Sequence, residues 1–114
     1  MKLGDIFALP ATELQRYLHD GSLSAEAVVN AVLAQIDRFD PELNAFAIVD
    51  RAGVQAAARA ADRHRAGNGV LGPFHGLPFS VKDVIQTKGL ETAYGSHLMA
   101  GNVPGKDMVA VCRL

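Results

Sequence analysis

The sequence has 114 residues with 11 Lys and Arg, 12 Asp and Glu and a formal net charge of -1, which is the length of one ordinary domain with almost no charge bias. A dedicated nucleic-acid-binding protein is excluded, because binding phosphates through counterion release needs an excess of basic residues. The composition is 49% hydrophobic and 20% charged, which excludes intrinsic disorder and predicts a folded core.

The apolar stretches of the sequence are only a few residues long, far short of the roughly 20 residues that a membrane-spanning helix needs. The apolar patch at residues 6–9 is too short for a secretory signal, and the single cysteine, Cys112, has no partner for an internal disulfide. We therefore expect a protein that does not bind membranes and that works in the reducing cytoplasm.

Two helices are predicted within residues 9–39. Pro10 lies near the start of the first helix, and Gly21 lies just past its end. Ser24 is a suitable N-cap for the second helix, whose apolar residues repeat at helical spacing. Pro41 is predicted to end this helix, because a proline disfavours the helical conformation at the residue before it.

Residues 44–84 are predicted to form a strand, a helix and a second strand. The run at 44–49 is apolar without polar alternation, which favours a strand covered on both faces. Asp50 is a candidate cap for a helix at 51–65 that carries a stripe of small residues. With a second strand at 78–84, this order predicts an α/β fold.

A glycine-rich loop and the start of a further helix are predicted over residues 85–114, and no repeat or linker divides the chain. The string GNGVLG at 67–72 satisfies the G-x-G-x-x-G pattern, but it follows a helix instead of opening one, so a plain turn is the better interpretation. We expect no cofactor. We expect no metal either, because the histidines lie too far apart in the sequence for a usual ligand spacing: His19, His64, His75 and His97.

Lys82 is the candidate catalytic residue. On a strand at 78–84 it projects on the same side as Ser80 and Val84, and either face of that strand is expected to be covered. Burial disfavours the charged form of a lysine, and a neutral amine can act as a general base near pH 7. Ser80 is a poor nucleophile for it, because residues two apart on a strand are about 6 to 7 Å apart at the backbone.

A second interpretation of Lys82 stays open on these grounds. It could reach solvent from an edge strand, or pair with Asp83 or another acid. Asp83 is a poor partner on the strand face, because adjacent strand residues point to opposite sides. The residues alone therefore leave Lys82 either as a general base or as an ordinary paired or solvated lysine.

The segment GPFHGLPFSVKD at 72–83, with GL at 89–90 and TAYGS at 92–96, resembles the first catalytic block of the amidase signature family. The preceding helices and the run at 44–50 resemble the amino-terminal region of the same family. The resemblance implies an α/β fold in which a large mixed sheet is surrounded by helices, and an amide hydrolase that uses a Ser–cis-Ser–Lys triad. Lys82 corresponds to the triad lysine, which relays a proton through a bridging serine to the nucleophile.

The resemblance also implies that the chain is incomplete. The family's two catalytic serines would follow Leu114, and Ser96 lacks their glycine-rich context, so residues 1–114 are expected to be the amino-terminal portion of a single amidase domain and inactive alone. The implied substrate is a small-molecule amide, and the whole protein could form a homo-oligomer. Two alternatives stay open: the A subunit of a tRNA-dependent amidotransferase, which passes ammonia to a partner subunit, and a non-catalytic interaction module derived from the amidase fold.

Overall fold

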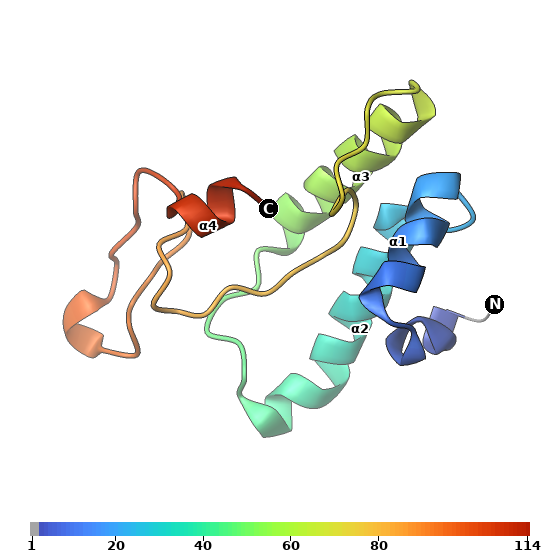
Figure 1. Ribbon diagram of the computed structural model, residues 1–114. Helices are drawn as coiled ribbons and strands as arrows, with labels where there is room; N and C mark the ends of the chain where they lie inside the picture. The colour runs from blue at the N-terminus through green and yellow to red at the C-terminus, as the bar shows by residue number, and fades with distance from the viewer. Residues whose placement is uncertain (1–2) are drawn as a thin grey trace. The chain divides into compact units, whose positions relative to one another are not determined.

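The computed structural model describes residues 3–114. Its elements are helical, and no strand occurs in the described range. The chain forms two compact units, of which the first comprises the residues up to Ala45 together with Arg51–Pro78, and the second comprises Phe46–Asp50 together with Phe79–Leu114. Figure 1 shows the elements in chain order: η1 (Leu3–Ala8), α1 (Ala11–Asp20), α2 (Ala25–Leu43), α3 (Arg51–Ala66), η2 (His97–Met99) and α4 (Val109–Cys112).

Helix α1 lies where the sequence places its first helix, between Pro10 and Gly21. Gly21 ends the helix with a φ of 82°, a conformation that glycine adopts without the steric cost that a Cβ brings. A Cβ at this position would also lie 2.4 Å from Nη1 of Arg65. That arginine tip is the end of a flexible side chain and can move aside, so it is the positive φ that favours glycine in the turn after α1.

Asp20, at the end of α1, has a carboxylate that is stabilised by Ser22. The hydroxyl and the backbone N–H of Ser22, the latter at 2.8 Å, lower the pKa of Asp20 below its ordinary value of 3.8, with smaller contributions from Arg16 and Arg65. A lowered pKa in the folded chain stabilises it above pH 3.8, and this contribution is lost as the pH falls through the folded-state pKa.

We expect Ser22→Ala to raise the pKa of Asp20 toward 3.8, because the largest cause of its lowering is the Ser22 hydroxyl. An NMR titration of the Asp20 carboxyl carbon in both proteins measures this shift. Arg16→Gln is the control and should move the pKa upward by less, since that arginine acts only through charge. A Ser22→Ala titration curve that overlays the original would contradict the assignment.

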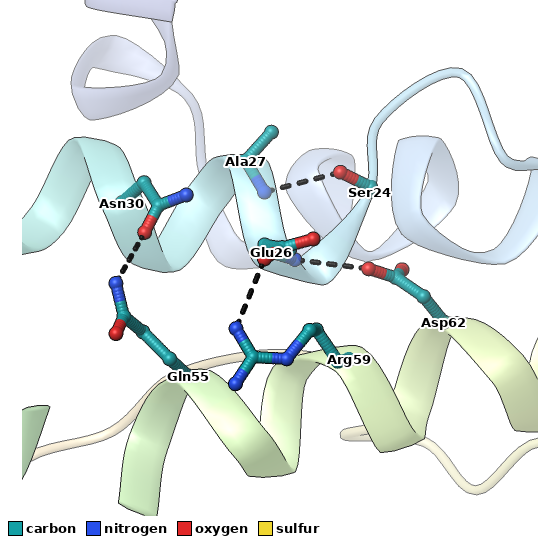
Figure 2. A network of polar contacts seen from close by, with 7 residues as sticks. All are labelled: Ser24, Glu26, Ala27, Asn30, Gln55, Arg59 and Asp62. Atoms are coloured by element: carbon teal, nitrogen blue, oxygen red, sulfur yellow. Dashed lines mark hydrogen bonds and ion pairs between the residues drawn. The ribbon is translucent and has the colours of Figure 1, made fainter. Parts of the chain in front are cut away.

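Helix α2 begins as predicted. The Ser24 side chain accepts a hydrogen bond from the N–H of Ala27 at 3.0 Å, which satisfies one of the donors left free at a helix start. Two further donors are satisfied from α3, where the Asp62 carboxylate accepts the N–H groups of Ala25 at 2.8 Å and Glu26 at 3.0 Å. The start of α2 is thus capped both by its own serine and by a second helix (Figure 2).

The predicted end of this helix at Pro41 is wrong, because α2 continues to Leu43. A proline removes its own N–H from the helix ladder and its ring crowds the carbonyl four residues earlier, but the last turn of α2 is held by other bonds. The N–H of Asn44, which has a φ of 50°, donates to the backbone oxygen of Asp40 at 2.7 Å. The Asp40 carboxylate also accepts the N–H of Ala45 at 2.7 Å.

Helices α2 and α3 pack antiparallel in the first unit. Glu26 pairs with Arg59 at 3.2 Å, the amide of Gln55 donates to Asn30 at 3.0 Å, and nearer the other end of α2 Asp37 pairs with Arg51. The buried apolar residues of this unit come mainly from α2 and its neighbours: Ile6, Leu18, Ala25, Val28, Val29, Leu33 and Ala58.

Helix α3 extends one residue beyond its predicted end and is followed by the predicted glycine turn. The N–H of Gly67 donates to Arg63 at 3.0 Å and the N–H of Gly69 donates to His64 at 3.1 Å. Asn68 between them has a φ of 55°. The G-x-G-x-x-G string therefore lies in the turn that ends a helix.

The predicted α/β fold is wrong for the part of the chain that the structure describes, because neither 44–49 nor 78–84 forms a strand. An extended segment becomes a strand only when its backbone pairs with a neighbouring segment, and no such ladder occurs within residues 3–114. The segments are also not covered on both faces, since Phe46, Ile48, Phe79 and Val84 are exposed. A short apolar run without alternation is an ambiguous signal, because it does not identify the partner that a strand requires.

The second unit consists mainly of turns and loops held by backbone hydrogen bonds. Gly89 donates to Pro104 at 3.0 Å and Thr92 donates to Asn102 at 2.8 Å, so two stretches of the glycine-rich region lie side by side. The Asn102 side chain returns a bond to the backbone oxygen of Thr92 at 2.9 Å, and Thr92 is only 2% exposed. Helix α4 then begins at Val109, within the stretch 85–114 for which the start of a helix is predicted.

Candidate functional site

Lys82 lies in the second unit at the start of a turn over residues 82–85, in which its backbone oxygen accepts the N–H of Ile85 at 2.9 Å. The Lys82 side chain is exposed, and its amine forms no hydrogen bond or ion pair with any residue of the described range 3–114. The described residues therefore do not bury the Lys82 side chain as the predicted covered strand would. Ser80 is also exposed and is not hydrogen-bonded to Lys82.

Asp83 binds the backbone of a distant loop and does not pair with Lys82. Its Oδ1 accepts the N–H of Ala93 at 2.9 Å, and its Oδ2 accepts the N–H of Gly95 at 3.1 Å. Its backbone oxygen accepts the N–H of Tyr94 at 3.0 Å. Three consecutive N–H groups thus converge on the residue that follows Lys82, an arrangement that sequence spacing does not indicate.

The loop that Asp83 binds is a tight turn over residues 93–96. The N–H of Ser96 donates to the backbone oxygen of Ala93 at 2.9 Å, and the two central residues, Tyr94 and Gly95, have φ values of 56° and 68°. This is the pattern of a type I′ turn, in which asparagine and glycine are the favoured central residues. A tyrosine at positive φ is unusual and indicates a turn held by its surroundings.

The Ser96 hydroxyl binds the backbone of its own loop. It accepts the N–H of Leu98 at 3.2 Å and caps the short helix η2. Together, Lys82, Asp83 and the turn at 93–96 form the candidate site.

Three histidines that are distant in the sequence lie near one another in the first unit. The ring centroids of His64 and His75 are 5.5 Å apart, and those of His19 and His75 are 6.4 Å apart. The Nε2 atoms of His64 and His75 bind the backbone oxygens of Val70 and Ala61, each at 3.0 Å. Within the described residues no group of three histidine, cysteine or acidic side chains is arranged to hold a metal ion.

None of the described helices is both long enough and apolar enough to cross a membrane.

Comparison with known proteins decides the family. A sequence model of the Amidase family matches residues 27–114, which is more than half of the chain and includes the whole candidate site. The chain belongs to the amidase family. Its membership agrees with the resemblance carried by residues 72–83, and it places Lys82 within the matched region.

Relatives of this amidase-family chain include named components of a larger enzyme. The chain is 38% identical over 112 residues to the glutamyl-tRNA(Gln) amidotransferase A subunit of Streptomyces coelicolor, in a match that covers 98% of the chain and 22% of that protein. It is 43% identical over 110 residues to the protein of the same name from Salinispora arenicola, covering 96% and 22%. The chain therefore spans about a fifth of the length of these relatives.

A solved structure also resembles this amidase-family chain. It is described as a vestigial protein complex that reveals the evolutionary origins of an s-triazine catabolic enzyme. The two share 32% sequence identity and a TM-score of 0.87 over 92% of this chain and 23% of the other. The backbone of this chain therefore resembles that of a solved protein over nearly its whole length.

Proposed function

We propose that this chain is the part of an amide-cleaving enzyme that supplies the lysine base, Lys82. The observation that carries the proposal is the position of Lys82 in the block at 72–83, inside the region that matches the Amidase family. In this proposal the base takes the proton of a serine through a bridging serine. The serine oxygen then attacks the amide carbonyl and forms an acyl-enzyme, the amine leaves with a proton, and water releases the acid.

The proposal places a requirement on the surroundings of Lys82. A base must be a neutral amine, and an amine surrounded by water holds its proton strongly. Because the described residues leave the Lys82 side chain exposed, residues other than these must cover the amine and bring the bridging serine to it. Without them, residues 1–114 are expected to release no ammonia from an amide.

The activity that we favour is that of an amidotransferase component, which passes the ammonia it releases to a partner subunit. The specific observation is that relatives 38% and 43% identical over nearly the whole chain are named as the A subunit of glutamyl-tRNA(Gln) amidotransferase. A stand-alone amidase that acts on small amides is the second candidate, and it uses the same Lys82 chemistry.

Ammonia release separates the two candidates. We expect the whole protein to hydrolyse L-glutamine, and to do so at least several-fold faster when its partner subunits and glutamyl-tRNA(Gln) are present. The control is benzamide, a small amide whose hydrolysis should not respond to partners. Rapid benzamide turnover by the whole protein alone would instead identify an amidase. No turnover of either substrate under any of these conditions would contradict the catalytic proposal and favour the interaction module.

A further inference from the structure

We infer that Asp83 is a positioning residue for Lys82, which it holds in place by fastening the lysine-bearing turn to the turn at 93–96. The inference rests on the proposed function of Lys82 and adds to it a residue that does not touch the substrate. It is carried by the three hydrogen bonds between Asp83 and the backbone of residues 93–95.

Asp83 joins two turns because it takes part in both. It is the second residue of the turn at 82–85, which is closed by the bond from the N–H of Ile85 to the backbone oxygen of Lys82. Its carboxylate and its backbone oxygen bind the other turn at three points. Since Lys82 and Asp83 are separated by one rigid peptide bond, fixing Asp83 in this way also fixes the backbone from which the Lys82 side chain extends.

The turn at 93–96 needs these bonds to keep its shape. Tyr94 has a φ of 56°, a conformation that residues with a Cβ seldom adopt unless their surroundings enforce it. The Asp83 carboxylate binds the N–H groups of Ala93 and Gly95, and the backbone oxygen of Asp83 binds the N–H of Tyr94. These three bonds favour the positive-φ conformation of Tyr94 over an extended one. Removing the carboxylate should therefore release the turn and give the backbone at Lys82 freedom to move.

The expected consequence is a loss of turnover without a loss of substrate binding. A displacement of about 1 Å at a reacting group can lower the rate by about 100-fold. We therefore expect Asp83→Ala in the whole protein to lower kcat by about 10- to 100-fold and to leave KM within about threefold, because in this inference Asp83 forms no bond with the substrate.

Asp107 provides the matched control. It is another acid of the second unit, and its carboxylate accepts the backbone N–H of Lys88 at 2.6 Å. Unlike Asp83, it is not a sequence neighbour of Lys82. Asp107→Ala should leave kcat within about twofold. If it lowers kcat as much as Asp83→Ala does, general loosening of the unit explains both results and the inference is overturned.

A second substitution tests the mechanism by rescue. Tyr94→Asn places the sequence Asn-Gly at the centre of the turn, which is the pair that type I′ turns favour. We expect Asp83→Ala with Tyr94→Asn to recover kcat by at least about threefold over Asp83→Ala alone, because the turn then holds its shape without the carboxylate. No recovery would show that Asp83 acts otherwise than through this turn.

The outcomes separate this inference from the proposed function. If a Lys82 variant is inactive while Asp83→Ala keeps full kcat, the inference fails and the proposed function stands. If Lys82 variants keep full activity, the proposed function itself fails. If Asp83→Ala does not fold, Asp83→Asn replaces it, because the one oxygen of the asparagine amide can still accept one N–H group. The expected fall in kcat is then smaller, about three- to tenfold. An unchanged kcat of Asp83→Asn would overturn the inference.

Discussion

Replacing Lys82 by methionine should lower the rate of ammonia release by the whole protein by at least about 1000-fold, because general base catalysis contributes about 10²- to 10⁴-fold and triad members act together. Methionine keeps an unbranched apolar chain and removes the amine. Initial rates with L-glutamine measure the effect, and circular dichroism checks that the variant is folded like the original.

Lys82→Arg sharpens the test. If the site needs only a positive charge, arginine should retain much of the activity. If it needs a base, arginine should be as inactive as methionine, because a guanidinium does not lose its proton at neutral pH. We expect the second result.

Lys88→Met is the matched control for these variants. Lys88 is an exposed lysine of the same unit, and its structural bond to Asp107 comes from the backbone N–H and not from the amine. Its activity should stay within about twofold of the original. A Lys82→Met protein that is as active as Lys88→Met would remove Lys82 from the mechanism.

The local elements of the fold could be predicted, because their signals lie within a few residues of one another. The capping of α2 by Ser24, the glycine at the end of α1 and the turn after α3 each follow from neighbours in the sequence. The predicted strands failed for the opposite reason. A strand is defined by a partner, and a short apolar run contains no information on whether that partner is present.

The candidate site could be predicted only in part. Lys82 is predicted as a base because it lies on an expected strand that is covered on both faces. The described structure contains no such strand. The support for the role of Lys82 therefore comes from the family resemblance and from the family match. The bonds made by Asp83 escape prediction because they reach loop residues 10 and 12 positions away. The sequence does not indicate which backbone N–H groups will bind a given carboxylate. The bonds of Asp83 to the turn at 93–96 can therefore be recognised only in the folded structure.

Asp62 escapes prediction for the same reason and has a large expected effect on stability. In the sequence it appears among Arg59, Arg63 and Arg65 as one more residue of a charged helix face. In the structure its two carboxylate oxygens accept N–H groups from the start of α2, 36 and 37 residues away. The negative charge also lies at the positive end of the α2 dipole.

We expect Asp62→Ala to lower the free energy of unfolding by about 2 kcal/mol, because two partly buried donors lose a charged acceptor at a helix start. Urea unfolding of the chain followed by circular dichroism measures the change, and an unaltered slope would show that the same structure unfolds. Asp62→Asn keeps one accepting oxygen without the charge and should lose about half as much.

Arg59→Ala is the control for this prediction, since it removes an interaction between the same two helices that is exposed to solvent. Arg59 and Glu26 form an ion pair at 3.2 Å whose side chains are 47% and 42% exposed, and exposed pairs contribute less than about 1 kcal/mol. If Arg59→Ala destabilises the chain as much as Asp62→Ala, then packing between α2 and α3 dominates. Capping of α2 by the Asp62 carboxylate would then not be what holds the two helices together.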